Sequence, residues 1–337
     1  MRSKKMKSNH LILFSFLAIL LIILFLASLI FGSVHIPLQD IFATFTGDRT
    51  NIITSEILLN LRLPKAITAV LTGASLSVAG LMMQTLFRNP LADPYILGVS
   101  SGASLGVALT VLTTGALPFF IFANDGWTMI ISATIGASLV LMLVIAVSFK
   151  IRNAISLLIV GIMFGMIAGS LVQVLQNFSN PDSIKLFVMW TFGSLSAVTW
   201  QYMQILFPVV VIGIGMAFFL QKNLDGLLLG ENYARSLGIS ITRTRVLIVI
   251  ATGLLAGSIT AFVGPIAFVG IAIPHIARGL FRTANHRTLL PASILCGASL
   301  LLVCDIVSQI PAHNLPINTV VALFGAPVII WVILKNK

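Results

Sequence analysis

Charged residues are scarce in this chain. Only 9% of its 337 residues are Asp, Glu, Lys or Arg, whereas about a quarter are charged in ordinary soluble domains. Hydrophobic residues make up 58% of the sequence, which is more than a soluble fold can bury, so a protein that crosses the membrane several times is the class that fits. The same composition excludes nucleic-acid binding as the reason for the net charge of +11.

Several chemistries lack the residues that would carry them. The only cysteines, Cys296 and Cys304, lie about two turns apart in one apolar segment, too far along a helix for a disulfide. The chain has neither the G-x-x-x-x-G-K-[ST] loop that cradles ATP phosphates nor an H-E-x-x-H metal motif. Ser100 stands in a G-x-S-x-G pattern, but that pattern opens a membrane helix, so an intramembrane enzyme is the weaker rival. We expect a transport subunit without catalytic residues, cofactor or metal.

Apolar segments of membrane-spanning length recur along the whole chain, which predicts an all-α polytopic protein with a single membrane domain over residues 1–337. Ten spans are predicted: 11–31, 66–87, 94–115, 126–149, 153–178, 199–220, 246–263, a short span ending near 280, 288–307 and 316–334. A further short helix is expected at 186–195. Gly264-Pro265 breaks an apolar run that is too long for one span.

The basic residues are divided unevenly between the two sides that ten spans define. All of them except Arg49, Arg62, Lys65 and Lys185 fall in segments on the side of the two termini. The positive-inside rule therefore places both termini in the cytoplasm. The spans themselves have no mid-membrane Asp, Glu, Lys or Arg. Ion-coupled carriers usually need such groups, so an externally powered pathway is favoured over a secondary transporter.

Residues 221–245 form the longest predicted cytoplasmic segment, and residues 229–238 within it predict a short helix. Glu231 at its start and Arg235 one turn later suit the helix dipole and each other, and Gly238 is a natural stop. An apolar knob is predicted on one side of this helix, made of Tyr233, Ala234 and Leu237. The helix either rests on the membrane surface or docks a cytoplasmic partner.

Glycines recur at a spacing of four in two of the spans. The first series is Gly98, Gly102 and Gly106, and the second is Gly161, Gly165 and Gly169. This spacing puts the glycines on one helix face, where a neighbouring backbone can approach closely. Tight helix packing and a smooth wall along a wide substrate passage both remain open as explanations.

Three polar positions have two interpretations each. His275 is a hydrogen-bonding group at a helix end or a metal ligand, and Asp305 is a packing acid near an outer helix end or a substrate ligand. The pair His286-Arg287 is a structural cytoplasmic turn or part of a docking surface for a partner.

Separate stretches of the chain together resemble one known family. They are Arg62-Leu63-Pro64-Lys65, the run Arg88-Asn89-Pro90-Leu91-Ala92-Asp93-Pro94, Gly230-Glu231 with Ala234 and Leu237-Gly238, the segment 268–291, and Gly325-Ala326-Pro327. These motifs resemble those of the FecCD-type permeases, the type II ABC importers of iron-siderophores, haem and vitamin B12. The resemblance covers residues 10–337 and implies the type II importer permease fold in the bacterial cytoplasmic (inner) membrane.

The resemblance also implies partners. We expect a homodimer with the pathway between two copies, two ATPase subunits that bind ATP and Mg, an extracytoplasmic substrate-binding protein and surrounding membrane lipid. The cargo is expected to be an iron chelate, haem or cobalamin, moved by alternating access. The alternative is a secondary transporter of a small solute without an ATPase partner.

Site residues follow from the same resemblance. The ATPase-coupling residues are expected to be Gly230, Glu231, Ala234, Arg235, Leu237 and Gly238, and the inner gate Asn153, Ala154 and Ile155. Arg62 and Lys65 match positions that meet acids on the binding protein; the alternative is that they anchor the helix end at the lipid headgroups. Lys65 replaces the usual Arg, and a third basic position of the family is Gln309 here, so a weaker or shifted outer contact is expected.

Overall fold

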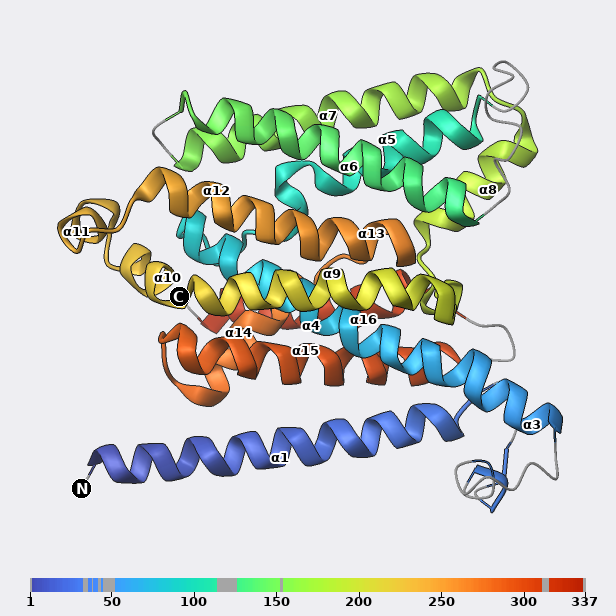
Figure 1. Ribbon diagram of the computed structural model, residues 1–337, viewed down its shortest axis with the longest axis horizontal. Helices are drawn as coiled ribbons and strands as arrows, with labels where there is room; N and C mark the ends of the chain where they lie inside the picture. The colour runs from blue at the N-terminus through green and yellow to red at the C-terminus, as the bar shows by residue number, and fades with distance from the viewer. Residues whose placement is uncertain are drawn as a thin grey trace.

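In the computed structural model, all regular secondary structure among the described residues is helical. These are residues 2–32, 36–37, 39–41, 44, 52–113, 126–151, 154–310 and 315–335. The long helices lie side by side in one bundle, with α1 along one edge and α7 along the opposite edge (Figure 1). Except at its ends, each helix pairs its backbone N–H and C=O groups within itself, as a lipid environment requires.

The predicted ten apolar helices are confirmed as seven long helices and three shorter ones within the described residues. The helices α1 (Arg2–Ile30), α6 (Gly126–Ser148), α7 (Ala154–Asn177), α9 (Trp200–Phe219) and α15 (His286–Ser308) are long and uninterrupted. The short ones are α5 (Val99–Val111), α14 (Val269–Phe281) and α16 (Ile317–Lys335). The other long spans are built from several consecutive helical pieces.

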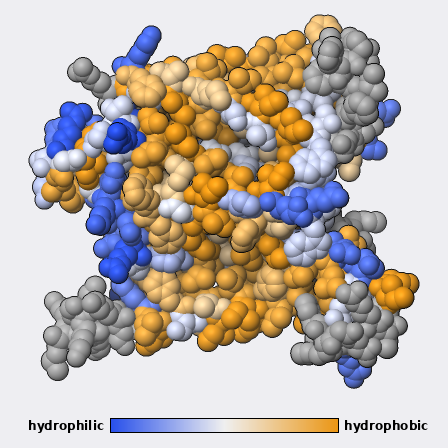
Figure 2. All heavy atoms as spheres, in the orientation of Figure 1, coloured by the Kyte–Doolittle hydropathy of each residue, from blue (hydrophilic) through white to orange (hydrophobic). Residues whose placement is uncertain are grey.

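The two ends of the chain lie on the same side of the bundle, as predicted. The start of α1 and the end of α16 lie on the side that carries α10 (Gln221–Leu228) and α11 (Glu231–Ser236) (Figure 1). Hydrophilic residues gather at this edge and at the opposite one, with an apolar band between them (Figure 2). That band is the surface expected to face the hydrocarbon of a membrane.

The second span begins much earlier than predicted. The segments α3 (Ile52–Glu56), η1 (Ile57–Arg62) and α4 (Leu63–Phe87) form one continuous helix over Ile52–Phe87. The prediction of a start at Ala66 was wrong because the span was located as a charge-free segment, whereas the helix includes the charged residues Arg62 and Lys65. Here Pro64 follows a π-helical turn, η1, and stands in the first turn of α4, where a missing N–H is tolerated.

Two other irregular segments were predicted in part. The predicted break at Gly264 is confirmed, because Gly264 has φ +91° and ends a span made of α12 (Ile241–Thr252), η5 (Gly253–Gly257) and α13 (Ser258–Val263). The short helix expected at 186–195 lies earlier, as α8 (Pro181–Thr191), followed by the turn η4 (Leu195–Ala197). A turn η2 (Pro94–Leu97) precedes α5, which starts only after Gly98.

Helix α4 is the centre of the bundle. In its span 89% of the most apolar window is buried, whereas the corresponding figure for α1 is 11%. A Cβ on Gly73 would overlap the backbone of Gly297 in α15, and a Cβ on Gly80 would overlap the backbone of Gly270 in α14. Glycine at these crossings therefore lets two helices approach α4 at backbone distance.

The two glycine series differ in how closely they are packed. A Cβ on Gly102 or Gly106 would meet backbone atoms of α6, and a Cβ on Gly161 would lie 2.9 Å from the Ile96 carbonyl oxygen. Tight packing therefore explains these three glycines. Gly165 has only ordinary contacts at 3.4 Å, and a Cβ on Gly169 would meet nothing within 4 Å. The interpretation of a smooth wall along a substrate passage consequently stays open for Gly165 and Gly169.

Candidate functional site

The predicted cytoplasmic helix is present as α11, which spans Glu231–Ser236. Gly230 precedes it with φ +120°, and Gly238 follows it with φ +80°. Such positive φ values suit glycine and strain other residues. The chain therefore uses glycine on both sides of α11 to turn sharply out of α10 and into α12.

The apolar knob on α11 is smaller than predicted. Tyr233 and Leu237 are 52% and 57% exposed, but Ala234 is fully buried. Ala234 faces α10, where a Cβ built on Gly226 would lie 3.8 Å from the Ala234 Cβ. Placing Ala234 in the exposed knob was therefore wrong, because one helical step turns its side chain away from the face that Tyr233 and Leu237 share.

The expected pairing of Glu231 with Arg235 is also wrong. Glu231 Oε1 instead accepts from Arg245 Nη2 of α12 at 3.2 Å, and Arg235 is exposed. An exposed pair within one helix contributes only a few tenths of a kcal/mol, about 0.3–0.5. A buried guanidinium that is already held in place is the better partner, and it ties the start of α11 to α12.

A second arginine holds the end of α10. Arg88 follows α4 in a left-handed conformation, with φ 47°. Its Nε and Nη2 donate to the Leu227 carbonyl oxygen at 3.1 and 2.9 Å. A cation at the carboxyl end of a helix satisfies carbonyls that have no partner within the helix. The motif that follows α4 is thereby fixed to the segment that leads into α11.

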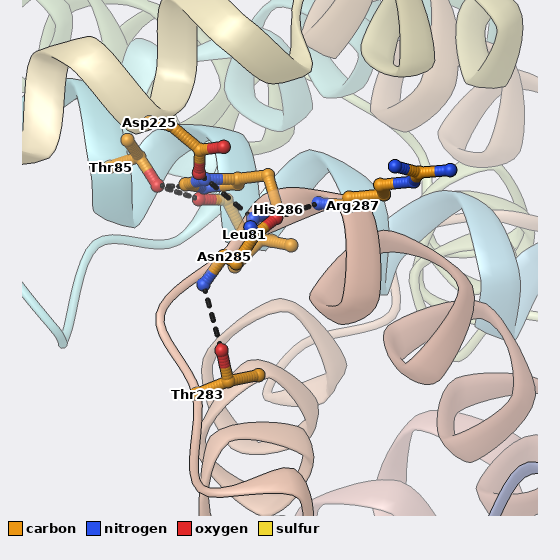
Figure 3. Close-up of polar contacts among 7 residues, drawn as sticks. All are labelled: Leu81, Thr85, Asp225, Thr283, Asn285, His286 and Arg287. Atoms are coloured by element: carbon orange, nitrogen blue, oxygen red, sulfur yellow. Dashed lines mark hydrogen bonds and ion pairs between the residues drawn. The ribbon is translucent and has the colours of Figure 1, made fainter. Parts of the chain in front are cut away.

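His286 connects α15 to α10 and α4 (Figure 3). Its Nδ1 donates to Asp225 Oδ1 at 2.7 Å, and its backbone N–H donates to the same oxygen at 2.9 Å. Its Nε2 lies 2.9 Å from Thr85 Oγ1, whose hydroxyl donates to the Leu81 carbonyl oxygen. Since that hydroxyl has a single hydrogen, all these bonds form together only when both ring nitrogens carry protons.

The contacts of His286 identify it as part of a structural turn. The side chain is 1% exposed, so it is not available to a partner. Burial raises the pKa of the Asp225 carboxyl, but the hydrogen bonds and the charge of His286 together bring the pKa below its usual value. Arg287 points away from this cluster (Figure 3), and its backbone N–H donates to the Asn285 side chain.

Hydrogen bonds also connect Arg278 and His275 of α14 to α4 and the segment that follows it. Arg278 Nη1 donates to Gln84 Oε1 at 2.5 Å, and Gln84 Nε2 donates to the Ile271 carbonyl oxygen at 3.2 Å. His275 Nε2 lies 2.8 Å from the Pro90 carbonyl oxygen. These bonds join α4 and the segment after it to α14, which supports the hydrogen-bonding interpretation of His275.

The two outer cations predicted to dock a binding protein have partners within the chain. Arg62 is 7% exposed, and its Nη1 donates to the carbonyl oxygens of Leu29 and Ile30 at the end of α1, at 2.7 and 2.8 Å. Lys65 Nζ lies 2.8 Å from Asp305 Oδ1, with side chains that are 16% and 1% exposed. Asp305 is thus a packing acid, and the docking role of both cations stays a prediction.

Gln309 belongs to the same outer cluster. Its Nε2 donates to Asp305 Oδ2 at 3.1 Å and to the Asp305 carbonyl oxygen at 3.0 Å. Both charged partners lie inside helices near their outer ends, in the spans Ile52–Phe87 and His286–Ser308. The prediction that charges are missing from the middle of the spans is therefore unaffected by this pair.

The predicted inner gate lies where α7 begins. Asn153 is outside the described residues. Ala154 is half-buried, and Ile155 is 62% exposed on the cytoplasmic end of α7. The gate role of these residues stays a prediction.

Comparison with protein-family models assigns the chain to a family. The model described as the FecCD transport family matches residues 20–335. The chain belongs to the FecCD transport family.

Individual relatives of this FecCD chain agree with that assignment. The chain is 34% identical to the ABC transporter permease protein YvrB of Bacillus subtilis, over 97% of this chain and 93% of that protein. It is 39% identical to the vitamin B12 import system permease protein BtuC of Photorhabdus laumondii, over 82% and 81%. It is 32% identical to the hemin transport system permease protein HmuU of Yersinia pestis, over 97% and 96%.

A solved structure resembles the FecCD chain equally well. It is described as an inward-facing conformation of a metal-chelate type ABC transporter, and it superposes with a TM-score of 0.84 at 28% identity, covering 96% of this chain and 99% of the other. The chain is therefore the multi-pass permease subunit of a bacterial ABC importer. Its family implies a separate ATPase that binds ATP and a binding protein as partners.

Sequence reasoning missed the residues that hold the coupling segment of this FecCD permease in place. Arg88 was recognised only as part of a motif, Arg245 was counted only as a charge on the cytoplasmic side, and Asp225 was not singled out. Each has a partner in another helix, at least 14 residues away in the sequence. Spacing along the chain carries no signal for such contacts.

Proposed function

We propose that two copies of this FecCD permease form a pathway for an iron chelate, haem or cobalamin. The relatives support this cargo class, since one is named for vitamin B12 import and another for hemin transport. Alternating access would open the pathway to each side of the membrane in turn, powered by ATP hydrolysis in two partner ATPase subunits.

The form of α11 is the observation that carries the coupling proposal. Its exposed Tyr233 and Leu237 project at the cytoplasmic edge, while Ala234 and Glu231 fix the opposite side to α10 and α12. A rigidly held helix with an exposed aromatic and an exposed aliphatic side chain suits insertion into a groove on a partner. We assign ATPase docking to this segment: Gly230, Glu231, Ala234, Arg235, Leu237 and Gly238.

The exposed face of α7 supports a second copy as the partner across the pathway. This face is apolar and uncovered within the chain, and it comprises Met163, Met166, Ile167, Leu171 and Val174. Gly169 leaves open space on the same helix. Two residues of the predicted gate, Ala154 and Ile155, begin this helix at its cytoplasmic end, where a constriction between two copies would close the pathway.

The binding protein is assigned to the outer side of the permease, opposite the cytoplasmic edge that carries α11, at a surface near Lys65. Of the two outer cations, Lys65 keeps the more accessible side chain, and Arg62 contributes by holding the end of α1. An acidic lobe on the binding protein would be steered toward such a cation mainly through the association rate.

Uptake into proteoliposomes tests the proposal. The permease is reconstituted with its cognate ATPase and binding protein, and uptake of cyanocobalamin, hemin and a ferric hydroxamate siderophore is measured separately. We expect one of these cargoes to enter only with ATP and an active ATPase. Uptake that persists without the ATPase would instead support the secondary-transporter alternative, and ATP-dependent uptake of none of the three would reject the proposed cargo class.

A further inference from the structure

One buried guanidinium joins three cytoplasmic segments. Arg245 is in the second turn of α12, and its side chain is only 4% exposed. Its Nη2 donates to Glu231 Oε1 at 3.2 Å, and its Nη1 donates to the Ile151 carbonyl oxygen at 2.9 Å. Arg245 therefore contacts both the first residue of α11 and the segment between α6 and α7.

The two partners of Arg245 lie beside two predicted working parts of the transporter. Glu231 begins α11, the helix assigned to ATPase docking. Ile151 ends the turn after α6, shortly before α7 starts at Ala154. A planar guanidinium presents donors in fixed directions, so it can hold a carboxylate and a carbonyl at the same time. A lysine ammonium at the same place lacks this fork.

We propose that Arg245 is a positioning residue that transmits movement of α11 to the segment that opens α7. When an ATPase displaces α11, Glu231 moves with it, and the guanidinium carries that displacement to the Ile151 carbonyl. Both bonds are charge-assisted, and the guanidinium that donates them is buried, so they resist breaking during the movement. This inference rests on the proposed docking of the ATPase on α11.

A purely architectural role for Arg245 predicts a different result. If the residue only holds the fold, its replacement lowers the amount of assembled transporter, but each assembled transporter still moves the same amount of cargo per ATP hydrolysed. If it transmits movement, the assembled transporter continues to hydrolyse ATP and moves less cargo per ATP. The ratio of uptake to hydrolysis in the same vesicles separates the two roles.

The experiment compares Arg245→Gln with the matched control Arg243→Gln. Arg243 lies on the same helix and is exposed, so the control removes an equal charge without breaking the described link. We expect Arg245→Gln to lower cargo moved per ATP by about tenfold, within the usual range of coupling between sites. Arg243→Gln should keep the wild-type ratio. Arg245→Lys should be intermediate, because it keeps the charge and loses one of the two contacts.

A second variant keeps the test decisive if Arg245→Gln does not assemble. Glu231→Gln preserves size and leaves the Arg245 contact with Ile151 in place, and it should also lower the ratio. The effects of the two variants should be non-additive when combined, as expected for residues in one link. Wild-type ratios in both single variants, or fully additive effects, would overturn the inference. A wild-type permease that fails to retain its ATPase would instead reject the proposed function itself.

Discussion

Replacing Lys65 with Met should destabilise the permease measurably. The substitution removes the cation that lies 2.8 Å from Asp305 Oδ1, and the Asp305 side chain is only 1% exposed. The carboxylate would then be buried beside Gln309 alone, which donates one hydrogen bond to it at 3.1 Å. An unpaired buried charge is costly because neither water nor a counter-ion compensates it.

The size of the effect follows from that burial. Breaking a buried ion pair by removing one partner costs about 3–5 kcal/mol. Lys65 is 16% exposed and Gln309 remains, so the lower end, about 3 kcal/mol, is expected here. In a chain of this length the midpoint of thermal unfolding should fall by roughly 3–6 °C, since the shift per kcal/mol decreases with size.

The assay is the folded, monodisperse fraction after heating in detergent, measured by size-exclusion chromatography. Lys185→Met is the matched control, because Lys185 is an exposed lysine predicted on the same outer side; it should leave the midpoint unchanged. Combining Lys65→Met with Asp305→Asn should restore most of the loss, because the second substitution removes the buried charge. A single variant as stable as the wild type would refute the assignment of a buried pair.

The double variant also separates stability from docking. If Lys65 contacts the binding protein as proposed, Lys65→Met with Asp305→Asn should remain stable and still associate more slowly, with a difference that shrinks at high salt. An association rate equal to that of the wild type would remove Lys65 from the docking surface.

Three further predictions concern the cytoplasmic half and α7. Ala234→Trp should dislodge α11 from α10, because the buried site has no room for the larger side chain and overpacking costs about 1–3 kcal/mol. The ATPase should then no longer co-purify with the permease. Gly161→Leu should impair folding, since its Cβ would meet the backbone of η2, whereas Gly169→Leu should fold normally. The yield of monodisperse protein should therefore fall for the first variant and stay at the wild-type level for the second. The lowered pKa of Asp225 stabilises the fold above the usual carboxyl pKa, about 4, and this contribution is lost as the pH falls through the folded value. The protection of α10 against hydrogen exchange, expressed relative to the intrinsic exchange rate at each pH, should therefore fall in acid, and Asp225→Asn should show the reduced protection already at neutral pH.

The helices were predictable because a membrane limits the choices. An apolar segment of about 20 residues must form a helix to satisfy its backbone, so α6, α7, α9 and α15 lie within a few residues of their predicted positions. The start of the long second span was misplaced because charged residues were taken to lie outside the spans, whereas Arg62 and Lys65 lie within this helix. The π-helical turn η1, through which the helix continues, has no signature in the sequence.

The partners of charged side chains were the least predictable feature. A rule based on helical spacing paired Glu231 with Arg235, yet the tertiary structure brings Arg245 closer and shields it from water. Lys65 meets Asp305 for the same reason, since helices α4 and α15 are distant in the chain and adjacent in the bundle. Local rules describe exposed helices well, but burial strengthens contacts that only the fold creates.

Contact between α11 and the ATPase is the central claim, and site-specific photo-crosslinking tests it most directly. A photoreactive phenylalanine analogue replaces Tyr233, which is 52% exposed on α11, or Phe178, which is 84% exposed just after the opposite end of α7. In the assembled transporter, illumination should join the permease to the ATPase from position 233 and not from position 178. An intact assembly with no ATPase crosslink from position 233 would contradict the account.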